Sequence, residues 1–281
     1  MSGRGDPKRA MLTGTTLLAA LALGAGIVSL LGPDPLRTEL GARLAGPSAA
    51  HWLGQDGLGR DVLARVAHGA GISALVAAAV VAICLVVGVT IGTTAALAGG
   101  WVDVVLSRMI DVVLAFPGLL LAIAITAVRG PGVGNVIVAL SLLGWTGYAR
   151  LARAEISRLR SADFATAARA LGAGPIALAY RHLLPLAAPL LLVQATFAVS
   201  GAIVAEASLS FLGLGVPAPT PSWGAMLDEG RQFLLVAPHL VFAPGAVLAV
   251  TVLALQLLGD GLRDWLDVRT PPVGSAGRAT R

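Results

Sequence analysis

The sequence predicts an all-α integral membrane protein of about six transmembrane helices. Hydrophobic residues make up 56% of the 281 residues and charged residues only 12%, whereas soluble domains carry roughly a quarter charged residues. The mean hydropathy is +0.83. Apolar stretches of about 20 residues recur along the chain, which is the length that a helix needs to cross the hydrocarbon layer with its backbone amides paired internally.

Six apolar stretches meet this length requirement. They are residues 11–31, 72–98, 102–128, 133–151, 183–209 and 236–258. The first follows Arg4, Lys8 and Arg9, as a signal peptide would, but it is long and no small-residue cleavage site follows, so we expect it to be retained as a helix. Pro117 removes a backbone hydrogen bond inside the third stretch, which predicts a kink near Phe116.

The distribution of positive residues predicts the orientation of these helices. The loop between the fourth and fifth helices, residues 152–182, is rich in arginine, and positive residues are retained on the cytoplasmic side. Both termini are then cytoplasmic. The predicted organisation is a cytoplasmic segment 1–10, helix one at 11–31, an extracytoplasmic loop 32–68, a transmembrane domain 69–259 and a cytoplasmic tail 260–281.

Several function classes are disfavoured by what the sequence contains. Lys8 is the only lysine, so no P-loop is present and any ATP has to be hydrolysed by another subunit. The single Cys84 and four scattered histidines show no metal-ligand spacing, so we expect neither a metal nor a cofactor. The basic residues flank apolar runs and do not form stripes with aromatic residues, so we expect no nucleic-acid partner.

The arginine-rich loop has the pattern of two short helices. Gly172 and Gly174 are expected to end the first helix, and Pro175 suits the first position of the second. Ala165, Ala168 and Gly172 fall at i, i+3 and i+7, so one face of the first helix carries almost no side chains. That face is either a surface for close approach by a partner or part of a solvated connector, and periodicity does not separate these two interpretations.

At these residues the chain resembles the inner-membrane permeases of binding-protein-dependent ABC importers. The family pattern is Glu-Ala-Ala, three residues, Gly, and then Leu-Pro after about a dozen residues. Thr166 stands where the family has Glu, and the matching positions are Ala167, Ala168, Gly172, Leu184 and Pro185. The resemblance implies a type I ABC importer transmembrane domain in which this loop docks on the ATPase subunit. Closure of the ATPases on ATP would then move the membrane helices.

Further blocks are similar to the dipeptide and oligopeptide (nickel) branch of this family, specifically to the C-type member of its paired permeases. They lie at residues 51–73, 111–123, 144–153, 205–227 and 257–267. The resemblance implies a bacterial plasma membrane location and three kinds of protein partner: a second homologous permease, two cytoplasmic ATP-binding subunits and an extracytoplasmic substrate-binding protein. Di- or oligopeptides are the expected cargo, and nickel or another small solute is the alternative.

Four residues are candidates for the transport pathway or its gate. Arg108 and Asp111 are charged residues at i,i+3 in an apolar run, where charges are rare and paired, so we expect a structural or gating ion pair. The kink at Pro117 is either a moving gate or a static bend. Glu206 lies near the outer end of the fifth helix, where it either contacts cargo from a water-filled cavity or pairs with an external arginine or a backbone amide.

Two rival functions come from other classes. A stand-alone secondary transporter would need its own ion-coupling site and usually internal repeats, and neither is evident in the sequence. An intramembrane enzyme would need a nucleophile and a base in a recognisable motif, and none is visible.

Overall fold

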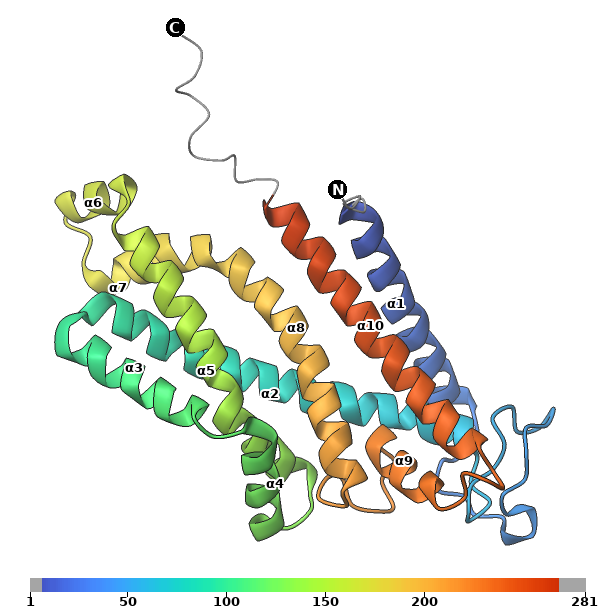
Figure 1. The fold of residues 1–281 in the computed structure, drawn as a ribbon. Helices are drawn as coiled ribbons and strands as arrows, with labels where there is room; N and C mark the ends of the chain where they lie inside the picture. Colours follow the sequence, from blue (N-terminus) through green and yellow to red (C-terminus); the bar gives the residue numbers. More distant parts are fainter. Residues whose placement is uncertain (1–6, 268–281) are drawn as a thin grey trace, which may run out of the picture.

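The computed structural model describes residues 7–267, and these residues fold almost entirely into helices (Figure 1). The elements are α1 (Pro7–Leu31), the short η1 (Leu40–Ala42), α2 (Val62–Ala98), α3 (Gly100–Leu114), α4 (Gly118–Arg129), α5 (Val133–Arg160), α6 (Asp163–Ala170), α7 (Pro175–Leu178), the π-helical turn η2 (Ala179–Leu183), α8 (Leu184–Phe211), α9 (Trp223–Arg231) and α10 (His239–Asp267). Among the described residues the only extended pairing is one bridge between Gln55 and Asp61. The predicted all-α class is confirmed.

The predicted spans correspond to these helices with some corrections. Four helices are long and apolar enough to cross a membrane, namely α1, α2, the continuous stretch from α7 to α8, and α10. The pair α3 and α4 adds a fifth span if it is counted as one. The predicted fourth span, 133–151, lies in α5, which is 28 residues long but less apolar than the others. By length and composition, the described residues therefore contain four or five spans, where the sequence predicted about six.

Two helices extend beyond the predicted spans. The extracytoplasmic loop was expected to reach residue 68, but α2 already begins at Val62, where the side chain of Asp61 accepts a hydrogen bond from the backbone N–H of Ala64 and caps the helix. The tail was expected from residue 260, but α10 continues to Asp267. Segments 1–6 and 268–281 lie outside the described residues.

The centre of the molecule is the crossing of α2 with α5. Gly88 and Gly92 on α2 face the backbone of α5, and a Cβ at either position would collide with a carbonyl oxygen, of Trp145 or of Ala149. Small residues allow this close approach, which is the usual basis of helix packing in membranes. The helix α8 packs against α2 and α5, while α1 packs along α10.

The third predicted span is broken, not kinked. Helix α3 ends at Leu114, α4 begins at Gly118, and their axes differ by 78°. Pro117 has an extended backbone with ψ of 112° and no N–H to continue the helical ladder, which explains why the chain leaves helical geometry here. The prediction of a local irregularity at Pro117 is confirmed, and the prediction of one bent helix is wrong.

The loops and helix ends gather at two opposite ends of the molecule. The start of α1, the end of α10 and the short helix α6 lie in the upper part of Figure 1, whereas α9 and the segment 32–61 lie in the lower part. The arginine-rich loop and the first long loop are thus on opposite sides of the helical bundle.

Candidate coupling segment and transport pathway

The loop that was expected to carry the partner contact forms two short helices, as the glycines predict. Residues 161–183, here called the coupling segment, leave α5 at Ser161 and enter α8 at Leu184. Helix α6 ends at Ala170, and Gly172 follows with φ of +90°, a conformation that favours glycine. Pro175 occupies the first turn of α7, where its missing N–H has no cost.

The small face of α6 points inward. Ala165 is fully buried and Ala168 packs against the core of the same chain, whereas Gly172, after the end of the helix, is exposed. The exposed side of α6 carries Thr166 and Ala167 instead. The Thr166 hydroxyl accepts a hydrogen bond from Nη2 of Arg169 at 3.2 Å, and Nη2 of the same arginine donates to the carbonyl of Arg160 at 2.8 Å.

Three large apolar side chains of the coupling segment are highly exposed. Leu171, Ile176 and Tyr180 expose 90%, 74% and 68% of their surface, while Leu178 and Leu183 are buried beneath them. Large apolar side chains that are this exposed outside a helical bundle indicate a protein interaction surface. Our sequence reasoning missed these three residues, although their position beside Gly172 and Gly174 in an arginine-rich loop was a usable signal.

Arginines fasten the end of α5 to the hairpin of α2 and α3. Arg153 makes a two-pronged ion pair with Asp103, with Nε–Oδ1 and Nη2–Oδ2 distances of 2.5 and 2.6 Å. Arg160 donates from Nη1 to the carbonyl of Ala96 at the end of α2. Paired planar geometry makes Arg–carboxylate contacts strong and directional. The helix that leads into the coupling segment is therefore held to its neighbours by charge.

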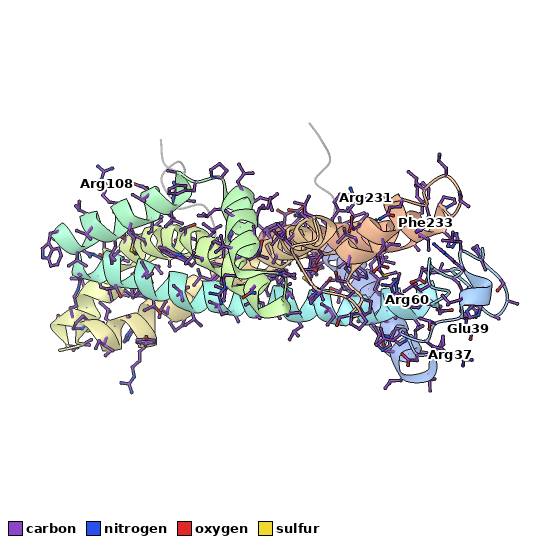
Figure 2. All side chains as sticks on the ribbon, turned by 90° about the horizontal axis from the view of Figure 1, so that it is seen from below. Arg37, Glu39, Arg60, Arg108, Arg231 and Phe233 are labelled. Carbon is purple, nitrogen blue, oxygen red and sulfur yellow. The ribbon has the colours of Figure 1, made fainter. Side chains whose placement is uncertain are left out.

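The predicted pair of Arg108 and Asp111 is present but peripheral. Nη1 and Oδ2 lie 3.8 Å apart, and the two side chains are 80% and 59% exposed, so the pair is weak. Figure 2 shows Arg108 at the opposite end of the molecule from Arg60 and Arg231. The residue of α3 that does form a close ion pair is Asp103, and its partner is Arg153.

Glu206 does not face a water-filled cavity in this structure. It is fully buried, and its carboxylate accepts hydrogen bonds from the hydroxyls of Ser73 at 3.1 Å and Ser210 at 2.7 Å. The first serine is on α2 and the second is one turn further along α8. Neither partner that we had considered, an external arginine or a backbone amide, is used. Glu206 therefore joins two helices through hydroxyl groups.

The four predicted pathway residues do not form one site. Glu206 is enclosed between α2 and α8, Arg108 and Asp111 are on the surface of α3, and Pro117 is at the break before α4. Within the described part of the chain, the hydrogen bonds of Glu206 connect it to none of the other three.

At the other end of the molecule, an ionic cluster of three buried residues and the partly exposed Glu229 joins the first loop to α9. This outer clamp consists of Asp56, Arg60, Arg65 and Glu229. Arg60 Nε lies 2.7 Å from Asp56 and its Nη2 lies 3.0 Å from Glu229, while Arg65 contacts both acids and is only 2% exposed. Figure 2 shows Arg60 between α2 and the loop that carries Glu39. The sequence analysis did not predict this cluster.

The charge balance sets the protonation of Asp56. Burial by itself raises the pKa of its carboxyl group, but the backbone N–H groups of Arg60 and Leu58 and the positive charges of Arg65 and Arg60 outweigh it, so the pKa lies below the ordinary value. Asp56 is therefore ionised at neutral pH, and the clamp holds two positive and two negative groups.

Comparison with known proteins identifies the family. Residues 88–270, more than half of the chain, match the model of the binding-protein-dependent transport system inner membrane component. The chain belongs to this family. It is thus a permease component, and components of this kind are transporters and not catalysts.

Relatives support the same assignment over most of the permease. It is 43% identical over 222 residues to the glutathione transport system permease protein GsiD of Pectobacterium atrosepticum, covering 79% of this chain and 74% of the relative. It is 43% identical over 225 residues to the dipeptide transport system permease protein DppC of Alkalihalophilus pseudofirmus, covering 80% and 74%. The GsiD protein of Shigella dysenteriae is 46% identical over 226 residues, covering 79% and 73%.

Proposed function

We propose that this permease forms half of the pathway of an ATP-driven importer for di- or oligopeptides, in which separate ATPase subunits dock on the coupling segment. The observation that carries the proposal is the exposed apolar surface of Leu171, Ile176 and Tyr180. This surface stands at the end of a helix that charge pairs fasten to the membrane bundle. Force applied to the surface by a partner reaches α5 and α8 directly, because both helices border the segment.

The energy source has to be external to the chain. The sequence contains one lysine and no P-loop, so ATP binding belongs to two partner subunits. The coupling segment, the start of α1 and the end of α10 lie at one end of the molecule (Figure 1), which supports a cytoplasmic position for both termini under the positive-inside rule. The outer clamp then lies on the extracytoplasmic side, where a substrate-binding protein delivers cargo.

A second, homologous permease supplies the other half of the pathway. The pair α3 and α4 is broken by irregular backbone. Inside a membrane, such backbone is tolerated only where protein or water covers it. A partner permease and a water-filled pathway between the two would satisfy that requirement. The peptide assignment rests on relatives that carry the names of glutathione and dipeptide systems.

Co-purification tests the docking surface. The transporter is extracted gently from membranes through a tag on this chain, and the recovered ATPase subunit is quantified for wild type and Leu171→Asp. We expect at least a tenfold loss, because a charge at the centre of an apolar contact is left unpaired. Leu235→Asp is the matched control, since Leu235 is 98% exposed between α9 and α10, at the other end of the molecule. Equal recovery from all three proteins would contradict the docking proposal.

A further inference from the structure

A cavity of about 730 Å³, here called the apolar cleft, lies between α1 and the first half of α2. Its volume falls within the range of roughly 300–1,000 Å³ that is usual for small-molecule sites. Residues of α8, α9 and α10 complete its wall. A Cβ built at Gly24 or Gly26 of α1, or at Gly71 of α2, meets no atom within 4 Å. Open space therefore lies in front of both helices.

The wall of the cleft offers polar groups at one end only. None of the described residues in this wall is charged. The indole N–H of Trp223 donates to a main-chain carbonyl of α2 at 3.0 Å, and the Thr251 hydroxyl donates to a carbonyl of its own helix at 2.8 Å, so both groups are satisfied within the chain. The other polar side chains of the wall, Ser29 and Trp52, are exposed and lie toward the outer clamp. The inner part of the cleft therefore suits hydrocarbon.

The length of the cleft matches one leaflet of a bilayer. On α1 the wall runs from Leu18 to Ser29, a rise of about 16 Å, and on α2 from Leu63 to Ala78, a rise of about 22 Å. Half of the hydrocarbon core of a bilayer is about 15 Å thick. The cleft thus extends from the outer-clamp end of the bundle to about the middle of the membrane.

The cleft is continuous with a surface of α1 that faces lipid. Only 6% of the apolar span of α1 is buried, and Leu23 and Ile27 beside the cleft are 68% and 58% exposed. Because the chain belongs to an inner-membrane family, lipid surrounds such a helix where it does not touch protein. A partner helix about 10 Å across would need about 1,200 Å³ over a length of 16 Å, which is more than the cleft holds. A hydrocarbon chain is much thinner and fits.

We propose that the apolar cleft binds a phospholipid from the leaflet on the side of the outer clamp. The acyl chains lie between α1 and α2, and the headgroup lies beside Trp52. Tryptophan suits this position because its ring is apolar and its N–H is polar, which is why it gathers at the headgroup level of membranes. The lipid fills the space between the two helices and supports α1 on the side away from α10. The inference depends neither on the cargo nor on the ATPase subunits.

Photo-crosslinking tests what occupies the cleft. A photoreactive phenylalanine derivative replaces Ala74, which is exposed in the wall, or Leu23, which is exposed on α1 outside the wall. The assembled transporter is purified through a tag on this chain, washed with detergent until loosely held lipid is lost, and irradiated. Mass spectrometry of this chain is expected to show a phospholipid adduct at position 74 and none at position 23.

Other adducts would overturn the inference. An adduct with the second permease or another protein at position 74 would show that a protein covers the cleft. An adduct with detergent alone, or no adduct, would show that the cleft does not hold a phospholipid. Equal phospholipid adducts at both positions would show ordinary surface lipid.

Lipid retention by cavity-filling variants gives a second, independent test. Gly71→Leu fills the cleft from α2 and Gly26→Leu fills it from α1, so a folding defect in one variant leaves the other to decide. Phospholipid that stays with the washed transporter is quantified by mass spectrometry. We expect each variant to retain about one phospholipid fewer per copy of this chain than wild type.

Gly134→Leu is the matched control, since Gly134 is also exposed in a helix with open space but lies outside the cleft. It should retain as much phospholipid as wild type. Equal retention by wild type and both cleft variants, or a wild type that retains none, would overturn the inference. Either result would leave the importer proposal intact, because ATPase docking on the coupling segment is measured separately.

Discussion

Glu206 shows how a single carboxyl side chain can hold two membrane helices together. Its carboxylate is fully enclosed and accepts hydrogen bonds from Ser73 on α2 and from Ser210 on its own helix. A buried donor that loses its acceptor is costly. The residue therefore belongs to the packing of α2 on α8.

Removing this carboxylate should destabilise the permease. Glu206→Ala leaves both serine hydroxyls without their acceptor and opens a small void, so we expect a loss of about 2–4 kcal/mol in unfolding free energy. Glu206→Gln keeps an oxygen acceptor and should lose less than half as much. Thermal unfolding in detergent compares the three proteins. An alanine variant as stable as wild type would contradict this role.

Asp56 makes the outer clamp sensitive to strongly acidic conditions only. Because its pKa is lower in the folded protein than in the unfolded chain, its contribution to stability is fully present above the ordinary aspartate range, near pH 4, and is lost as the pH falls through the lower folded value. We expect Asp56→Asn to unfold at a lower temperature than wild type at pH 7. The difference should shrink as the pH falls below about 4. If the difference in unfolding temperature between wild type and Asp56→Asn stayed the same across this pH range, Asp56 would not be the titrating group.

At the scale of elements, the breaks and contacts between helices differ in how well the sequence predicts them. The break after α3 was signalled by Pro117, whose chemistry acts locally. The pairing of Asp103 with Arg153 joins residues fifty positions apart, and no local pattern announces it, whereas Arg108 and Asp111 at i,i+3 drew attention because they are neighbours. The inward turn of Ala165 likewise depends on how α6 packs on the rest of the chain.

The joint between α3 and α5 should matter for transmitting motion. Asp103→Arg and Arg153→Asp each place like charges together, so we expect either single change to lower ATP-driven uptake at least threefold while ATPase subunits still bind. The double variant restores opposite charges and should recover most of the uptake. Uptake and co-purified ATPase are measured side by side. Failure of the double variant to recover beyond the single variants would argue against a joint made by this ion pair.

At the scale of the whole molecule, composition predicted the helical membrane class, and the motif residues around Gly172 predicted the family that comparison then showed. Sequence patterns also located four spans and the interruption of another. They did not locate the outer clamp, because Asp56 and Glu229 come together only when the first loop folds onto α9. They did not identify the exposed side of the coupling segment, because exposure depends on the assembled bundle.

The same contrast applies to the candidate pathway. Periodicity and charge selected Arg108 and Glu206. The structure places Arg108 at the surface and Glu206 within a helix crossing. The exposed apolar residues of the coupling segment lie at one end of the molecule and the ionic clamp at the other, as the proposed link between an internal motor and an external delivery protein requires.

The most direct test of the account is reconstitution of the permease in liposomes with its second permease, ATPase subunits and binding protein, followed by measurement of labelled dialanine uptake. The account predicts uptake that requires ATP, this chain and the binding protein together, and that falls at least tenfold with Leu171→Asp. Uptake by this chain alone, driven by an ion gradient and indifferent to ATP, would contradict the account and identify a secondary transporter instead.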